Sequence, residues 1–296
     1  MRRSEALAGI ALTPLAALAA CAQTLSGVVA TKGSPLRPTA FGCQVYPSDD
    51  LGQVIPLLAA CGSKLLRITA NNDNFPYFDT LFAAAAQHGM RVVVISQYAA
   101  QPVDLTAYAA NAVTFHERYA TYDPIWELWN EPNLAQYWGA PPDRVAYAKL
   151  AIATATALRN AGAREILSGG TSGVDVNWLY DLRIHGVFDA VTGCAVHSYQ
   201  KPAKALNEYL QAVSLMPPGI AIYTTEACVV TSSGQPSFFR DMWNVHRYLG
   251  LPALVWCEFR DGTAGPNPPY TDPMGLVTAD YVLKDVYYTA QALINT

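Results

Sequence analysis

The segment IWELWNEP, Ile125–Pro132, carries the pattern that decides the fold. It opens with large apolar side chains, as a strand buried inside a protein does, and it ends in the polar residues Asn130 and Glu131. A helical pattern precedes it at Leu105–Tyr119, and another follows at Arg144–Ala161. The segment is therefore predicted to be a buried strand between two helices, with its polar chemistry at the carboxyl end.

The same alternation of short apolar runs and longer amphipathic stretches extends in both directions. The predicted strands are Phe41–Tyr46, Lys64–Ala70, Arg91–Tyr98, Ile125–Glu131, Glu165–Gly170, Ala190–His197, Ile220–Glu226 and Ala253–Phe259. The predicted helices are Asp50–Cys61, Tyr77–Gly89, Leu105–Tyr119, Arg144–Ala161, Val174–Ile184, Ala203–Val213, Ser237–Leu249 and Tyr281–Ile294. Eight strand–helix repeats predict an α/β fold, a single (β/α)8 TIM barrel over residues 40–296. A doubly wound open sheet is the alternative, but the first strand lacks the glycine-rich phosphate turn that is common in that fold.

Composition limits the function classes. Of the 296 residues, 51% are hydrophobic and 14% are charged, which suits a large buried core. The net charge of -4 argues against a nucleic-acid partner, because phosphate binding needs clustered Lys and Arg. The five histidines have no metal-ligand spacing and no Gly-x-Ser-x-Gly elbow is present, so neither a metal cofactor nor a serine hydrolase is predicted.

The first twenty residues have the pattern of a bacterial signal peptide. Arg2 and Arg3 precede an apolar run from Ala6 to Ala20 that is too short to span a bilayer comfortably. The run ends in Leu-Ala-Ala-Cys at Cys21, which resembles a lipobox and implies cleavage before Cys21 and acylation of its thiol. A soluble-export signal is the alternative. Residues 21–39 are predicted to be a lipidated tether, and an alanine after Cys21 favours the bacterial outer membrane, on either face.

Polar and aromatic residues gather where the predicted strands end. Because the active sites of such barrels lie at the carboxyl ends of the strands, these residues are expected to share one site. They are Arg67, Asn71, Gln97, Asn130, Glu131, His197, Tyr199, Glu226, Trp256 and Glu258.

The run from Trp126 to Asn133 resembles the fourth-strand signature of the clan A glycoside hydrolases, and its continuation to Trp138 is most similar to family 39 and related exopolysaccharide-cleaving enzymes. The resemblance implies a retaining hydrolase of a β-linked glycan, with Glu131 as general acid/base and Glu226 as nucleophile. Chemistry alone leaves open which carboxyl takes which role. Such enzymes hold the two carboxyl groups about 5–5.5 Å apart, with a raised pKa expected for the acid and an ionised nucleophile.

The same resemblance implies roles for the surrounding residues. Arg67 matches the arginine that steadies the nucleophile, and Asn130 matches the residue that binds the sugar 2-hydroxyl. In the His-x-Tyr pattern of the sixth strand, Tyr199 contacts the nucleophile and His197 lines the pocket. Trp256 matches the tryptophan on which the sugar ring stacks.

Plainer readings stay open for several of these side chains. A position in the core is the alternative for His197 and for Trp256, although the site is favoured for both. Gln97 and Trp138 are also predicted substrate contacts, although Trp138 suits a loop anchor nearly as well. Glu127 lies about four residues deeper than Glu131 and is predicted to be a buried structural carboxylate paired with an interior base.

Two other functions are alternatives. One is a catalytically silent glycan-binding lipoprotein of the cell envelope, which would not need both carboxyls, and the other is a transglycosylase that uses the same residues. The expected partners are a carbohydrate substrate and, through the lipid anchor, a membrane; the protein is expected to be a monomer without a cofactor. Mostly short loops suggest an open cleft and endo cleavage. Cys43 and Cys61 are a possible disulfide pair, against the alternative that both are buried as small apolar residues.

Overall fold

The computed structural model describes residues 39–96, 103–262 and 273–296. Cys21, the predicted signal peptide and most of the predicted tether lie outside these residues, and so does Gln97.

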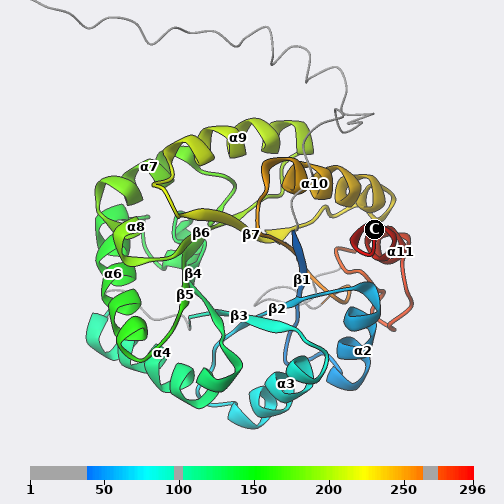
Figure 1. Cartoon of the computed structure of the whole chain (residues 1–296), viewed down its shortest axis with the longest axis horizontal. Helices are drawn as coiled ribbons and strands as arrows, with labels where there is room; N and C mark the ends of the chain where they lie inside the picture. The colour runs from blue at the N-terminus through cyan, green and yellow to red at the C-terminus, as the bar shows by residue number, and fades with distance from the viewer. Residues whose placement is uncertain (1–38, 97–102, 263–272) are drawn as a thin grey trace, which may run out of the picture. The chain divides into compact units, whose positions relative to one another are not determined.

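Eight parallel strands close into a barrel in the order in which they occur along the chain (Figure 1). They are β1 (Ala40–Gln44), β2 (Leu65–Thr69), β3 (Arg91–Ile95), β4 (Ile125–Asn130), β5 (Glu165–Ser172), β6 (Gly193–His197), β7 (Ala221–Ala227) and β8 (Ala253–Trp256). Pairing of β1 with β8 completes the circle. The prediction of a single (β/α)8 barrel is confirmed.

Helices surround the barrel wall in Figure 1. The longer ones are α2 (Leu51–Cys61), α3 (Phe75–Gln87), α4 (Leu105–Tyr119), α6 (Arg144–Asn160), α7 (Val176–Ile184), α9 (Pro202–Leu215), α10 (Gln235–Leu249) and α11 (Asp285–Ile294). Short helical pieces add α5 (Ala135–Trp138), α8 (Val187–Ala190), η1 (Ala120–Tyr122) and η2 (Ser232–Gly234). Among the described residues, none of the helices combines the length and the apolarity that crossing a membrane requires.

Aspartate caps fix where four of the helices begin. The carboxylates of Asp50, Asp104, Asp143 and Asp175 each accept hydrogen bonds from backbone N–H groups of the first helical turn. These N–H groups have no partner within the helix, so each cap contributes about 1 kcal/mol to stability.

The period of two along each strand separates an inner and an outer core. Inward-facing apolar residues such as Leu65 and Ile125 fill the barrel at one level. Two residues further along the same strands, Arg67 and Glu127 face the same interior nearer the carboxyl ends. The alternation along the strands therefore places charged side chains inside the barrel mouth, next to the layer of apolar side chains that fills the barrel.

The predicted disulfide between Cys43 and Cys61 is not formed. All five cysteines of the described chain are buried free thiols. Burial raises the pKa of Cys61 to about 12, which keeps it as an uncharged thiol. Both residues serve as small apolar side chains in the core around the barrel.

Candidate active site

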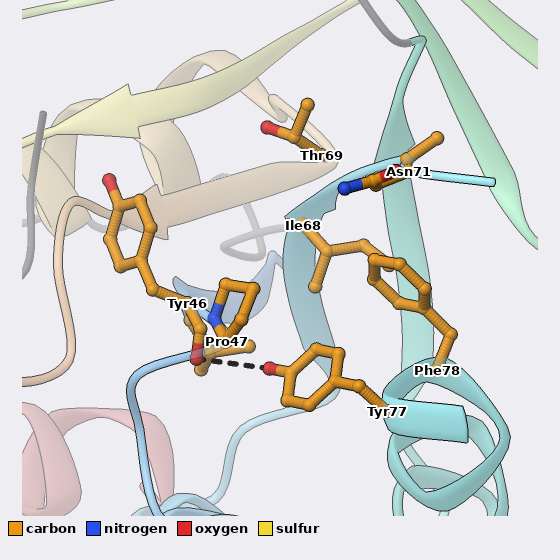
Figure 2. A pocket seen from close by; sticks show the side chains of 9 residues that line it. Tyr46, Pro47, Ile68, Thr69, Asn71, Tyr77 and Phe78 are labelled. Atoms are coloured by element: carbon orange, nitrogen blue, oxygen red, sulfur yellow. Dashed lines mark hydrogen bonds between the residues drawn. The ribbon is translucent and has the colours of Figure 1, made fainter. Parts of the chain in front are cut away.

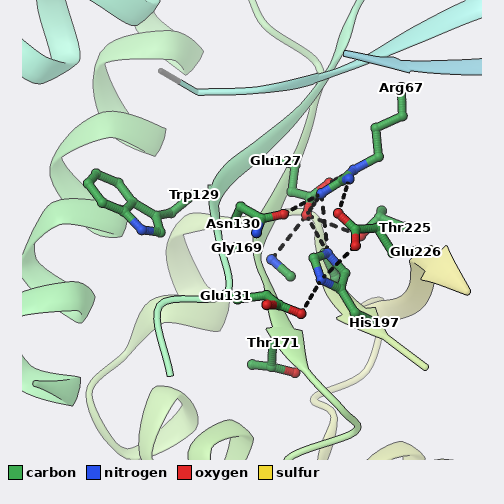
Figure 3. A network of polar contacts seen from close by, with 12 residues as sticks. Arg67, Glu127, Trp129, Asn130, Glu131, Gly169, Thr171, His197, Thr225 and Glu226 are labelled. Carbon is green, nitrogen blue, oxygen red and sulfur yellow. Dashed lines mark hydrogen bonds and ion pairs between the residues drawn. The ribbon is translucent and has the colours of Figure 1, made fainter. Parts of the chain in front are cut away.

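The residue at the centre of the barrel mouth is Arg67 of β2, which is fully buried (Figure 3). Its Nε lies 2.8 Å from Oε2 of Glu127, and its Nη2 lies 2.9 Å from Oε1 of the same carboxylate. This is a two-pronged ion pair, the geometry in which a guanidinium group matches a carboxylate best. It fixes the orientation of Arg67 within the barrel.

The remaining donors of Arg67 reach three other strands. Nη1 donates to Gln44 of β1 and to Glu226 of β7, while Nη2 donates to Oδ1 of Asn130 of β4 at 3.1 Å. One guanidinium group thus links strands on opposite sides of the barrel mouth.

Glu127 has the structural role predicted for it. Its Oε1 accepts hydrogen bonds from Oγ1 of Thr225 at 3.1 Å and from the backbone N–H of Gly170 at 3.2 Å. Burial alone would raise the pKa of Glu127, but Arg67 and His197 lower it to about 2. The group is therefore a fixed negative charge, and the prediction of a buried, ion-paired Glu127 is confirmed.

The end of β4 departs from regular strand geometry at Trp129 and Glu131. Both residues have positive φ values, 90° and 47° respectively, which are uncommon for residues other than glycine. The backbone N–H of Glu131 donates to the carbonyl of Gly170 at 2.7 Å. In Figure 3 the indole of Trp129 points away from the cluster and the carboxyl of Glu131 points into it.

Glu131 and Glu226 converge from β4 and β7. A carboxylate oxygen of each, together with a ring nitrogen of His197, lies in a group whose atoms are all within 4.8 Å of one another. Both carboxyl side chains are buried, with 6% and 8% of the residue surface exposed. The two carboxylates predicted from strand ends are therefore neighbours.

The surroundings of Glu226 favour its charged form. Arg67 donates to Oε1, the hydroxyl of Tyr199 donates to Oε2, and Nδ1 of His197 lies 3.5 Å from Oε2. Burial works against ionisation, but His197, Arg67 and the Tyr199 hydrogen bond together lower the pKa of Glu226 below its ordinary value.

His197 sits between the carboxylates. Its Nδ1 lies 3.0 Å from Oε1 of Glu131, and its Nε2 lies 3.3 Å from Oε1 of Glu127. Burial would lower the pKa of His197, but Glu226, Glu127 and Glu131 raise it to about 9. The imidazole is therefore a cation at neutral pH, donating a hydrogen bond on each side.

A glycine makes room for this imidazole. A Cβ atom at Gly170 would lie 2.2 Å from Nε2 of His197 and 2.5 Å from Oε1 of Glu127. Any side chain at this position would collide with both members of the ion pair.

The spacing along the sequence did not reveal that Glu131, His197 and Glu226 form a group that could hold a metal ion. Within this group Glu226 already has a positive partner in Arg67.

The structure corrects the predicted role of Trp256. Its side chain is fully buried, packs against Phe238 and Phe239 of α10 at centroid distances of 6.1 and 5.7 Å, and donates from Nε1 to the carbonyl of Met274 at 2.8 Å. The indole lies on the outer side of the barrel wall, so it cannot stack on a sugar in the barrel mouth. Its plainer reading as a core residue holds.

Trp138 is likewise a loop anchor. It is 3% exposed and packs edge-on against Trp129 and Tyr147, with centroid distances of 5.3 and 6.1 Å. Its ring has no free face for a substrate.

Several residues of the cluster were missed from the sequence. Gln44 and Thr225 complete the shell of Arg67 and Glu127, and both are polar side chains at the end of an apolar run. The aromatic side chains near the paired carboxyls include Tyr46 and Tyr137. Burial raises the pKa of each hydroxyl, and the nearby charge of Glu226 adds to this increase. Tyr199 is 41% exposed and is the most accessible of the three.

Solved structures to which this chain is similar in fold include glycoside hydrolases. They include a family 39 glycoside hydrolase from Bacteroides cellulosilyticus WH2 (16% identity, TM-score 0.71, covering 88% of this chain and 64% of that chain). A monomeric beta-xylosidase from Caulobacter crescentus CB15 has 16% identity and a TM-score of 0.67, covering 88% and 68%. A glucosidase from Croceicoccus marinus has 12% identity and a TM-score of 0.73, covering 89% and 69%.

These likenesses establish the fold, and at that level they confirm the resemblance to family 39. The chain spans about two thirds of the length of these proteins. No protein-family model matches the sequence, and no curated protein matches it.

Proposed function

We propose that the protein is a retaining glycoside hydrolase that cleaves a β-linked oligo- or polysaccharide by double displacement. The observation that carries the proposal is the convergence of Glu131 and Glu226, whose nearest carboxylate oxygens lie within 4.8 Å. Retaining enzymes hold their two carboxyl groups about 5–5.5 Å apart, whereas inverting enzymes need roughly 6.5–9.5 Å to admit a water molecule.

The surroundings of the two carboxyls support different roles for them. Glu226 receives hydrogen bonds from Arg67 and Tyr199 and is kept ionised, as a nucleophile must be. Arg67 makes no contact with Glu131, whose partner in the cluster is Nδ1 of His197. The arginine therefore stabilises the charge of Glu226 and not that of Glu131, which supports Glu226 as the nucleophile and leaves the acid/base role to Glu131.

The reaction then follows from these positions. Glu131 gives its proton to the departing glycosidic oxygen while Glu226 attacks the anomeric carbon, forming a glycosyl-enzyme ester. Glu131, now a carboxylate, takes a proton from the water that opens this ester. Nδ2 of Asn130 has no hydrogen-bond partner among the described residues, and it is available to the sugar 2-hydroxyl while Arg67 holds Oδ1.

The class of substrate and its location are part of the same proposal. One structural neighbour is described as a beta-xylosidase, which supports a β-linkage. The Leu-Ala-Ala-Cys motif at Cys21 supports export and lipid anchoring to the outer membrane, where an extracellular polysaccharide would be within reach.

Single substitutions of the two carboxyls test the proposal. Glu226→Ala is expected to lower kcat on 4-nitrophenyl β-glycosides by about 10⁴-fold or more, and Glu131→Ala by about 10²–10⁴-fold. Sodium azide should restore turnover, giving the α-glycosyl azide with Glu226→Ala and the β-glycosyl azide with Glu131→Ala.

Glu117→Ala is the matched control, because Glu117 is an exposed carboxylate on α4. It should leave turnover unchanged. Full activity in both Glu131→Ala and Glu226→Ala would rule the proposal out, and glycan binding without turnover by the unaltered protein would indicate a binding lipoprotein instead.

A further inference from the structure

Nine residues line a cavity of about 270 Å³ (Figure 2). It is lined from the ends of β1 and β2 and from the start of α3. Figure 2 shows the rings of Tyr46, Tyr77 and Phe78 around it, with Thr69 and Asn71 on the far side. Its volume is slightly below the roughly 300 Å³ of the smallest ligand pockets, so it suits one sugar unit better than an oligosaccharide.

The register of β1 and β2 places two of the cavity residues next to residues of the carboxyl cluster. Gln44 and Arg67 are partners across β1 and β2, and both face the interior. Tyr46 and Thr69 follow two residues later, so they stand one level above on the same side. Nε2 of Gln44 donates to the Tyr46 hydroxyl at 2.8 Å, which ties the cavity wall to Arg67, the residue that holds Glu226.

The cavity lies on the side of the bond that stays with the enzyme. The leaving oxygen must take its proton from Glu131, so the leaving group departs over the end of β4. The cavity is lined from the ends of β1 and β2, the strands that carry Gln44 and Arg67, and Arg67 is hydrogen-bonded to Glu226 of β7. A unit bound there belongs to the glycosyl part of the substrate.

The lining is uncharged and mainly apolar. No Asp, Glu, Lys, Arg or His side chain is among the described residues that line it. The hydroxyl of Tyr77 donates a hydrogen bond to the carbonyl of Tyr46 at 3.0 Å, and Oδ1 of Asn71 accepts one from the backbone N–H of Asp73. The hydroxyl of Thr69 and Nδ2 of Asn71 have no partner within the described chain, so a few donors face a largely apolar space.

We infer, on the basis of the proposed hydrolase function, that this cavity selects a neutral sugar unit of low polarity, one in which hydroxyls are absent or acylated. A fully hydroxylated unit would bring more hydroxyls into the cavity than it can bond, and a uronate would bring a charge without a counter-ion. Discrimination by an apolar pocket against an added hydroxyl is on the order of 10–100-fold in kcat/KM. A charged unit is discriminated against more strongly.

A panel of 4-nitrophenyl β-disaccharides tests the inference. The distal unit is a hexose, a 6-deoxyhexose, an O-acetylated hexose or a hexuronate, with the unit at the cleaved bond kept constant. The expected order is the deoxy or acetylated unit first, about 10–100-fold over the hexose, with the uronate last. The deoxy and acetyl arms show which of the two substituents the cavity prefers.

Thr69→Phe fills the cavity, and the ratio of kcat/KM between the preferred disaccharide and the hexose disaccharide should fall to about 1, mainly through KM. Asn71→Trp, at an exposed position, fills it from the rim and should act in the same direction if Thr69→Phe does not fold. Thr80→Val on the exposed face of α3 is the control, and its ratio should match that of the unaltered protein.

The inference is overturned if the unaltered protein shows no preference or prefers the hexuronate, or if the filled variants that fold keep the preference. Absence of turnover of every glycoside would instead contradict the proposed function. In that case calorimetric titration with the methyl glycosides of the same disaccharides decides the inference: tighter binding of the low-polarity unit, lost in the filled variants, supports it, and equal binding overturns it.

Discussion

Arg67 and Glu226 are hydrogen-bonded across the barrel mouth, from β2 to β7, with the guanidinium group wholly withdrawn from solvent. The same guanidinium group is fixed by its two-pronged pair with Glu127. The position of Glu226, the proposed nucleophile, therefore depends on a residue that is itself held by a second carboxylate. Substitutions at Arg67 are therefore expected to affect both stability and activity.

Arg67→Lys is expected to lower the free energy of unfolding by about 3–5 kcal/mol, because a lysine cannot serve both carboxylates and leaves buried charge unpaired. Activity on an aryl β-glycoside should fall with it. Denaturant unfolding measures the first effect. Arg118→Lys is the control, since Arg118 pairs with Asp79 at the surface and the change should cost about 1 kcal/mol or less. Equal effects at both positions would contradict the buried role of Arg67.

Tyr199→Phe is expected to shift the acid limb of the pH profile of kcat/KM to higher pH. The Tyr199 hydroxyl donates to Glu226 and helps to lower its pKa, so removing the hydroxyl raises that pKa and protonates the nucleophile at a higher pH. The loss of one hydrogen bond to a charged group should also reduce kcat/KM by about 10-fold. An unmoved acid limb in the variant would argue against Glu226 as the ionised group.

His197 makes stability fall with increasing pH. Its folded-state pKa of about 9 lies above the ordinary value of 6.5, so the stabilisation is fully present below about pH 6.5 and is lost as pH rises through 9. The difference amounts to about 3 kcal/mol. Thermal or denaturant unfolding from pH 6 to 10 measures it, and His197→Asn should remove the pH-dependent part.

His246 is expected to make stability rise with increasing pH, the opposite of the effect of His197. Burial lowers its pKa to about 4, although its hydrogen bond to the carbonyl of Met242 acts in the other direction. Its stabilisation is present above about pH 6.5 and is lost as pH falls toward 4. His246→Asn should therefore alter the acid side of the stability profile and leave the alkaline side as it is.

Trp256→Phe is expected to reduce stability without changing KM. The variant loses the hydrogen bond from Nε1 to Met274 and part of the packing against α10, which together cost about 1–3 kcal/mol. Because the indole lies outside the barrel mouth, binding of aryl glycosides should be unaffected. A rise in KM with unchanged stability would restore the stacking role that the sequence suggested.

Gly170→Ala is expected to abolish activity or folding. The added methyl group would collide with His197 and Glu127, and neither can move without breaking the ion-pair network. Gly219→Ala is the matched control, because no atom lies within 4 Å of a Cβ there, although its φ of +91° carries some strain. A fully active Gly170→Ala protein would show that the cluster tolerates displacement.

The barrel could be predicted from the sequence because each of the eight units has a short apolar run followed by a longer amphipathic stretch. It also placed Arg67, Glu131 and Glu226 at one end of the barrel, because the carboxyl ends of parallel strands meet there. The boundaries of some elements differ from the prediction: Ala190, predicted to open the sixth strand, is the last residue of α8 (Val187–Ala190), and β6 begins at Gly193.

Side-chain direction was harder to predict. In β8, Ala253 and Val255 face the interior, so Trp256 must face outward and Cys257 follows inward, beside Tyr199 and Glu226. The alternation of side chains along β8 predicts that Trp256 faces outward, whereas the family resemblance implies that it stacks on the sugar. At the end of β4 no count suffices, because the positive φ values of Trp129 and Glu131 break the alternation.

The two sides of the barrel mouth are expected to differ in how well they accept amino-acid substitutions. Gly170, His197 and Glu127 leave no space for substitution on the side of β4 to β6, whereas the cavity side chains Thr69 and Asn71 make no contact that the reaction needs. On the proposed function, substitutions that change substrate preference are therefore expected to be tolerated on the β1–β2 side, and substitutions among the packed residues of β4 to β6 are not.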